Sequence, residues 1–118
     1  MMKIFKYIFA FLIFGCSNSE SLLFELMDES TTGIKFENTL SYTEEFNPYT
    51  YRNFYNGAGV SLGDINNDGL IDIYFTGNIV NNALYLNKGN WKFEDITNSA
   101  GVLCENNWST GATFIDIN

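Results

Sequence analysis

The nine consecutive residues from Asp64 to Asp72 constrain this chain more than any other feature. They run D-I-N-N-D-G-L-I-D and place oxygen-bearing side chains at positions 1, 3, 5 and 9. In a curled loop alternate side chains point inward, and Gly69 permits the sharp bend that such a loop requires. The candidate metal ligands are four side chains and one backbone carbonyl, from Asp64, Asn66, Asp68, Leu70 (carbonyl) and Asp72.

Hard oxygen ligands without nitrogen or sulfur favour Ca²⁺ over zinc or copper, and a flexible mixture of carboxylate, amide and carbonyl suits Ca²⁺ better than Mg²⁺. Two carboxylates ~4 Å apart at an effective dielectric of ~20 repel by about 4 kcal/mol, so we expect the metal-free loop to splay or to take up protons. An EF-hand is excluded because its twelfth position requires Glu, where this chain has Phe75. The alternative to a calcium site is a bare hairpin turn at Asn67-Asp68-Gly69.

Around this loop the hydrophobic pattern predicts short strands. We expect strands at 59–63, 70–76, 83–87 and 91–96, with Ile71, Ile73 and Phe75 on one face of the second. Upstream, we expect a short strand at 33–37 and a structured loop with aromatic anchors at 41–57, while residues 22–27 fit a helical turn or a strand. Short strands at this spacing predict an all-β fold: a sandwich, a barrel or a propeller.

A repeat favours the propeller. Residues 59–66 (G-V-S-L-G-D-I-N) recur as residues 111–118 (G-A-T-F-I-D-I-N). This period of about 50 residues suits a four-stranded propeller blade. We therefore expect a partial β-propeller, of about one blade plus the start of the next, and interpret the chain as a fragment of a larger propeller.

The first sixteen residues have the layout of a secretory signal. Lys3 and Lys6 precede an apolar run at 7–14, which is shorter than the roughly 20 residues a spanning helix needs, and Gly15-Cys16 closes it. A Cys after a small residue resembles a bacterial lipoprotein signal, which implies that Cys16 is acylated and that this anchor is the chain's only membrane contact. The chain would then be exported to the bacterial outer membrane or cell surface. An ordinary cleaved signal (giving a periplasmic or secreted protein) and a Cys16–Cys104 disulfide are the alternatives.

The chain thus divides into a signal at 1–16, a polar tether at 17–23, an N-terminal strand and aromatic loop region at 24–56, and a calcium-binding propeller repeat at 57–118.

Charge and composition exclude several functions. The chain has 14 acidic and 6 basic residues and a formal net charge of −8, which disfavours nucleic-acid binding. It has no His, so Ser-His-Asp and Cys-His catalysis and His-ligated metals are excluded. No catalytic residue is assigned, although five carboxylates leave open an extracellular polysaccharide-acting enzyme: Glu44, Glu45, Glu94, Asp95 and Glu105. The large aromatic side chains are expected mainly to pack, with ligand contact as the alternative: Tyr49, Tyr51, Tyr55, Trp91 and Trp108.

With this loop and repeat, residues 57–118 resemble the FG-GAP/VCBS-type repeats of integrin-like β-propellers, whose blades carry D-x-[DN]-x-[DN]-G-x-x-D calcium loops. The wider stretch from T-G-I-K-F-E-N (32–38) onward looks like the start of bacterial proteins related to cartilage acidic protein, which often end in an ASPIC/UnbV domain. The resemblance implies a calcium-binding, non-catalytic, extracellular or cell-surface module for adhesion. Its partner would be an unidentified protein or carbohydrate.

Overall fold

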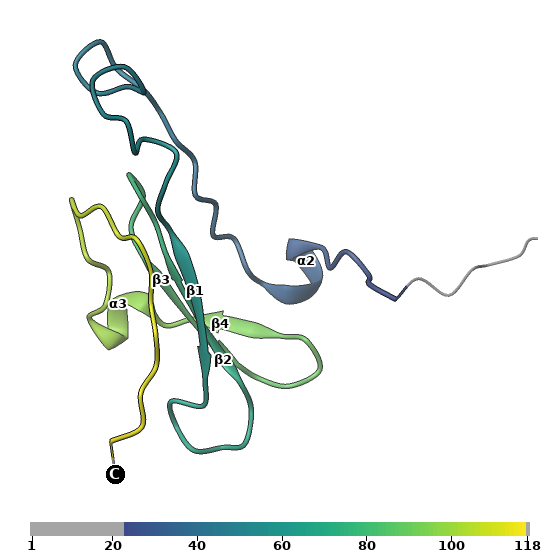
Figure 1. Ribbon diagram of the computed structural model, residues 1–118. Coiled ribbons are helices and arrows are strands. Elements are labelled where there is room, and N and C mark those ends of the chain that lie inside the picture. The colour runs from purple at the N-terminus through teal and green to yellow at the C-terminus, as the bar shows by residue number, and fades with distance from the viewer. Residues whose placement is uncertain (1–22, 118) are drawn as a thin grey trace, which may run out of the picture.

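The computed structural model describes residues 23–117, and in this range the chain forms a four-stranded antiparallel sheet with two short helices (Figure 1). The strands follow one another in the order β1-β2-β3-β4. Among the described residues, neither helix has the length or the apolar character needed to cross a bilayer. The signal at 1–16 with Cys16, and most of the tether, lie outside the described residues. The elements are α2 (Glu29–Thr32), β1 (Gly59–Gly63), β2 (Asp72–Thr76), β3 (Ala83–Asn87), β4 (Phe93–Asp95) and α3 (Thr97–Ala100).

The predicted all-β fold is confirmed, and the meander of four strands is consistent with a single propeller blade. The strands at 59–63 and 83–87 have the predicted bounds. The second strand begins at Asp72 rather than at residue 70, since the preceding residues still belong to the loop, so Ile71 lies outside it. The fourth is shorter than predicted because Asn90 and Trp91 have φ of 52° and 60°, which is incompatible with extended backbone.

The prediction of a strand at 33–37 is wrong. This segment pairs with no strand and instead lies on one face of the sheet, where Phe36 stacks on Phe75 with ring centroids 4.9 Å apart. The backbone N–H of Lys35 donates to the Tyr85 hydroxyl at 3.1 Å. The alternating pattern of this segment therefore arises because Phe36 packs on the face of the sheet. It does not indicate a strand that pairs with the edge of the sheet.

The chain upstream of this segment also differs from prediction, since residues 23–27 form neither strand nor helix and α2 begins at Glu29. The Asp28 side chain caps the helix by accepting from the Ser30 N–H at 2.7 Å. Gly33 ends it with φ +81°, and a Cβ there would lie 2.7 Å from the Phe93 carbonyl oxygen. Glycine is therefore required both by the backbone conformation and by the close approach to β4.

The C-terminal segment lies along β1. Ser109 N–H donates to the Gly77 carbonyl at 3.0 Å, and Phe114 N–H donates to Ser61 Oγ at 2.8 Å. A Cβ on Gly63 would lie 2.8 Å from the Phe114 ring, so this glycine makes room for that side chain. Tyr74 of β2 is opposite Ser61, and its neighbour Phe75 points to the other face of the sheet. The C-terminal segment and Phe36 therefore cover opposite faces. The second copy of the repeat thus begins against the first.

Candidate metal-binding loop

Asp64, the first residue after β1, organises the loop between β1 and β2. One carboxylate oxygen accepts from the Asp68 N–H at 3.1 Å and the other from the Gly69 N–H at 2.8 Å. Asn67 and Gly69 have φ of 58° and 82°, which lets the backbone curl over this carboxylate. The predicted bend at Gly69 is therefore observed.

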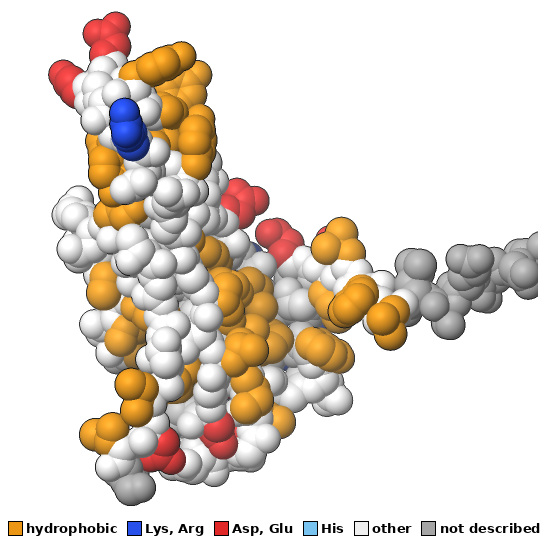
Figure 2. Space-filling view, in the orientation of Figure 1, with side chains coloured by type: hydrophobic (Ala, Val, Ile, Leu, Met, Phe, Trp, Pro, Cys, Tyr) orange, Lys and Arg blue, Asp and Glu red, His pale blue; other side chains and the backbone are white. Residues whose placement is uncertain are grey.

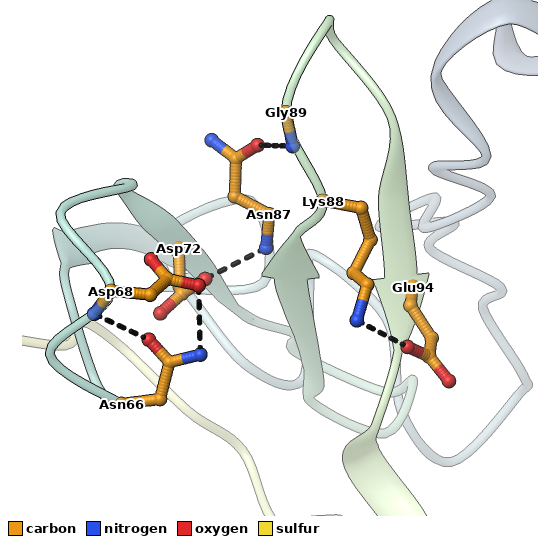
Figure 3. A network of polar contacts seen from close by, with 7 residues as sticks. All are labelled: Asn66, Asp68, Asp72, Asn87, Lys88, Gly89 and Glu94. Atoms are coloured by element: carbon orange, nitrogen blue, oxygen red, sulfur yellow. Dashed lines mark hydrogen bonds and ion pairs between the residues drawn. The ribbon is translucent and has the colours of Figure 1, made fainter.

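Asn66 and Asp68 form a second set of contacts inside the loop (Figure 3). Asn66 Nδ2 donates to Asp68 Oδ2 at 2.9 Å, while Asn66 Oδ1 accepts from the Asp68 N–H at 3.1 Å. Asp68 Oδ1 accepts from the Leu70 N–H at 2.8 Å. Both side chains are exposed to solvent, so this part of the loop is open to an ion from bulk water.

Asp72 differs from the other two aspartates because it is fully buried. Its two oxygens accept from the Ile65 N–H at 2.9 Å and from the Asn87 N–H at 2.7 Å. The buried carboxylate therefore joins the start of the loop to the end of β3.

Asn87 is a site residue that the sequence analysis missed. Its Nδ2 donates to the Ile71 carbonyl at 2.8 Å. Its Oδ1 accepts from the Gly89 N–H at 2.9 Å (Figure 3). It thus links the aspartate loop to the turn between β3 and β4. Its place just before the Lys88-Gly89 turn was the available signal, since Asn side chains often bond to backbone near turns.

Backbone N–H groups, and not cations, offset the charge of this loop. The bond from the Gly69 N–H is the main cause that lowers the pKa of Asp64, which keeps that carboxylate ionised. In the described part of the chain, no Lys or Arg pairs with the three aspartates, and the Lys88–Glu94 ion pair, at 3.4 Å, lies on the neighbouring hairpin.

The carboxylates do not meet at one point as expected. Among residues 23–117, no three acidic or Cys side chains gather closely enough to form a metal-binding group. Asp64, Asn66 and Asp68 share one hydrogen-bonded loop, while Asp72 lies buried at its base. All three carboxylates accept backbone hydrogen bonds, and the splaying or proton uptake of the metal-free loop stays a prediction.

The chemistry of the donor set nevertheless fits a hard divalent cation. Each oxygen of Asp64 and Asp68 accepts one or more hydrogen bonds at the loop, and a carboxylate offers about four lone-pair sites in all. The loop supplies oxygen ligands only, with no nitrogen or sulfur ligand of the kind that zinc or copper prefers.

The carboxylates considered for acid–base chemistry form no comparable arrangement. Glu94 pairs with Lys88, and Asp95 accepts from the Thr97 N–H at 3.0 Å, which starts α3. Both carboxylates therefore have structural partners.

The large aromatic side chains divide into two groups. Tyr51 and Trp108 pack, each with its ring centroid 5.4 Å from that of Phe46. Tyr49 and Tyr55 remain exposed, as does Trp91 on the β3–β4 hairpin. Packing is therefore confirmed for Tyr51 and Trp108, and Tyr55 packs one edge against Phe54, with ring centroids 5.3 Å apart, while the rest of its ring stays in solvent.

Residues 64–118 match the family model described as FG-GAP-like repeat. The match covers the aspartate loop, β2 to β4 and the segment that lies on β1, and it supports an FG-GAP repeat protein. Such a repeat suggests an extracellular module for interaction, and FG-GAP repeat domains are generally non-catalytic. No curated protein and no solved structure matches the chain. The resemblance to proteins related to cartilage acidic protein stays a prediction.

Proposed function

We propose that this chain is a calcium-stabilised, non-catalytic module at the cell exterior that binds a protein or carbohydrate in an adhesion-type role. The observation that carries the proposal is the Asp64–Asp72 loop, in which two exposed oxygen-bearing side chains and the half-buried Asp64 share one bend without a basic partner. The FG-GAP-like match supports the same role.

The loop stands where β1 and β2 diverge, since Gly63 is opposite Asp72 in the register. Ca²⁺, when bound, supplies positive charge that offsets the carboxylates. Asp64, Asn66 and Asp68 would hold it from the exposed side, with the Leu70 carbonyl and Asp72 completing the set of oxygens. The hydrogen bonds between Asn66 and Asp68 keep these two side chains next to each other in the loop, which limits the entropy lost when they bind an ion.

Calorimetry and thermal denaturation of the full chain test the calcium site. We expect Ca²⁺ to bind with measurable heat and to raise the melting temperature. At a free concentration of 100 Kd, binding should add about 2.7 kcal/mol to the free energy of unfolding. Asp64→Asn should abolish both effects, whereas Glu94→Gln, which alters an exposed carboxylate on β4, should retain them. If millimolar Ca²⁺ produces no heat of binding and no shift in melting temperature, the calcium site is refuted.

Export and lipid anchoring rest on Cys16, and a separate experiment tests them. Labelled palmitate supplied to expressing bacteria should be incorporated into the wild-type chain and not into Cys16→Ser. Export of an unlabelled wild-type chain would instead indicate an ordinary cleaved signal.

A further inference from the structure

The loop at 42–55 lies at the end of β1 opposite the aspartate loop (Figure 1). It carries an open hollow. The hollow has a volume of about 780 Å³, within the range of small-molecule sites. Hydrophobic side chains gather on this end of the molecule (Figure 2). Its lining consists of three tyrosines, one carboxylate and small polar or apolar residues: Tyr42, Thr43, Glu44, Asn47, Pro48, Tyr49 and Tyr55.

The backbone beneath the hollow is held by its own hydrogen bonds. Asn47 Nδ2 donates to the carbonyls of Thr43 and Glu44 at 3.0 and 2.9 Å. Asn47 Oδ1 accepts from the N–H groups of Tyr49 and Thr50 at 2.9 and 3.2 Å. One amide side chain therefore fixes both sides of the bend, and a surface of fixed shape loses little entropy when a ligand binds.

An aromatic cluster supports this loop from within. Phe54 is fully buried, and its ring centroid lies 5.3 Å from that of Phe46 and 6.1 Å from that of Trp108. Tyr55 contacts Phe54 edge to face at 5.3 Å while its own outer side remains in solvent. Packing thus accounts for the inner rings but leaves the outer tyrosines unexplained.

The three outer tyrosines expose most of their surface to solvent, so packing in the aromatic cluster does not explain their presence. Tyr42, Tyr49 and Tyr55 have 74%, 99% and 70% of their surface in solvent. Tyrosine provides a rigid, flat contact surface with a polar tip at low entropic cost, which suits recognition of a ligand that has both C–H faces and hydroxyl groups.

We infer that this hollow binds a neutral carbohydrate, by ring stacking on the tyrosines and hydrogen bonds to the phenol hydroxyls and Glu44. The inference specifies the ligand of the interaction role proposed above. No Lys or Arg lines the hollow, and the chain has a net charge of −8, so an anionic ligand is disfavoured. Tyr49 is too exposed to help enclose a compact cation, whereas an open, flat surface suits a sugar ring.

The test is calorimetry of the full chain in calcium-containing buffer with three neutral probes: cellohexaose, mannohexaose and xylohexaose. We expect at least one to bind, and Tyr49→Ala and Tyr55→Ala each to weaken it by roughly 5- to 10-fold. Tyr49→Phe should keep most of the affinity because the ring remains. Trp91→Ala, which removes an exposed aromatic side chain on the β3–β4 hairpin, is the matched control and should bind like wild type.

Two outcomes would overturn the inference: no heat with any of the three probes, or tighter binding of choline or of an oligogalacturonate than of every neutral probe. Because Ca²⁺ binding is measured separately, loss of sugar binding with intact Ca²⁺ binding refutes this inference and leaves the calcium proposal standing. Sugar binding that persists in Asp64→Asn, in which the calcium site is disrupted, would support the hollow independently of the calcium proposal.

Discussion

The two ends of β1 are held by different forces. Beyond Gly59, the aromatic end depends on rings packed around the fully buried Phe54. Beyond Gly63, the aspartate end depends on N–H groups that donate to the carboxylates of Asp64 and Asp72. Ring packing is sensitive to lost volume and nearly indifferent to charge, whereas the carboxylate contacts are sensitive to charge and to ions. The comparison teaches that one small sheet can carry a packed aromatic cluster at one end and a loop held by carboxylate hydrogen bonds at the other.

The largest expected effect comes from Phe54→Ala. Removing a fully buried ring should cost about 3–5 kcal/mol of unfolding free energy, because the cluster cannot refill the space. Urea denaturation measures this loss. Tyr49→Ala, which removes a solvent-exposed ring of the same loop, is the control and should change stability by no more than about 0.5 kcal/mol. Equal losses for the two variants would mean that the aromatic end is not packed.

Asp72→Asn tests the opposite end. An amide can accept with its one oxygen only, so one of the two buried N–H donors faces an NH₂ group, at a cost of about 1.5–3 kcal/mol. Urea denaturation in a calcium chelator should show the full loss, because both bonds join the carboxylate to backbone N–H groups of the protein itself. Asp68→Asn, at an exposed position, should cost far less there. If Asp72→Asn is harmful only when Ca²⁺ is present, its role is confined to the ion.

Gly33→Ala tests how the N-terminal segment attaches to the sheet. The left-handed backbone and a Cβ 2.7 Å from the Phe93 carbonyl oxygen should together cost about 1–3 kcal/mol. Gly101→Ala is the matched control, since Gly101 also has positive φ but no atom within 4 Å of the added Cβ. Thermal denaturation should show the larger loss for Gly33→Ala. Equal losses would mean that contact with β4 contributes nothing.

The smallest effect concerns Tyr74, which lies between the two ends. Burial is the main cause that raises the pKa of its phenol above the ordinary 10.0, and its hydroxyl donates to the Val102 carbonyl at 3.0 Å. The folded state therefore favours the neutral phenol. Its contribution to stability is fully present below pH 10 and is lost as pH rises through the raised pKa.

Urea midpoints measured from neutral to strongly alkaline pH check this behaviour. Tyr74→Phe should cost about 1 kcal/mol at pH 7 and should lose stability less steeply than wild type above pH 10. Identical alkaline profiles for the two proteins would contradict a role for this phenol.

Much of the sheet and of the loop could be predicted because their signals are local. Period-two alternation marks β1, and the bend at Gly69 follows from the loop sequence itself. The segment at 33–37 has the same alternation but lies on a sheet face, because Phe75 and Tyr85 offer it side chains instead of an open edge. Alternation gives the spacing of side chains but not the partner that they meet.

The sequence by itself determined the nine-residue loop with its oxygen-bearing side chains, the strands around it and the acidic charge, because turn chemistry and hydrophobic period act between neighbouring residues. Only the tertiary structure decided that Asp72 is buried while Asp68 is exposed, that Asn87 joins the loop to the next hairpin, and that Phe54 packs while Tyr49 faces solvent. These outcomes depend on which distant segments cover each side chain, and burial by distant segments leaves no periodic trace in the chain.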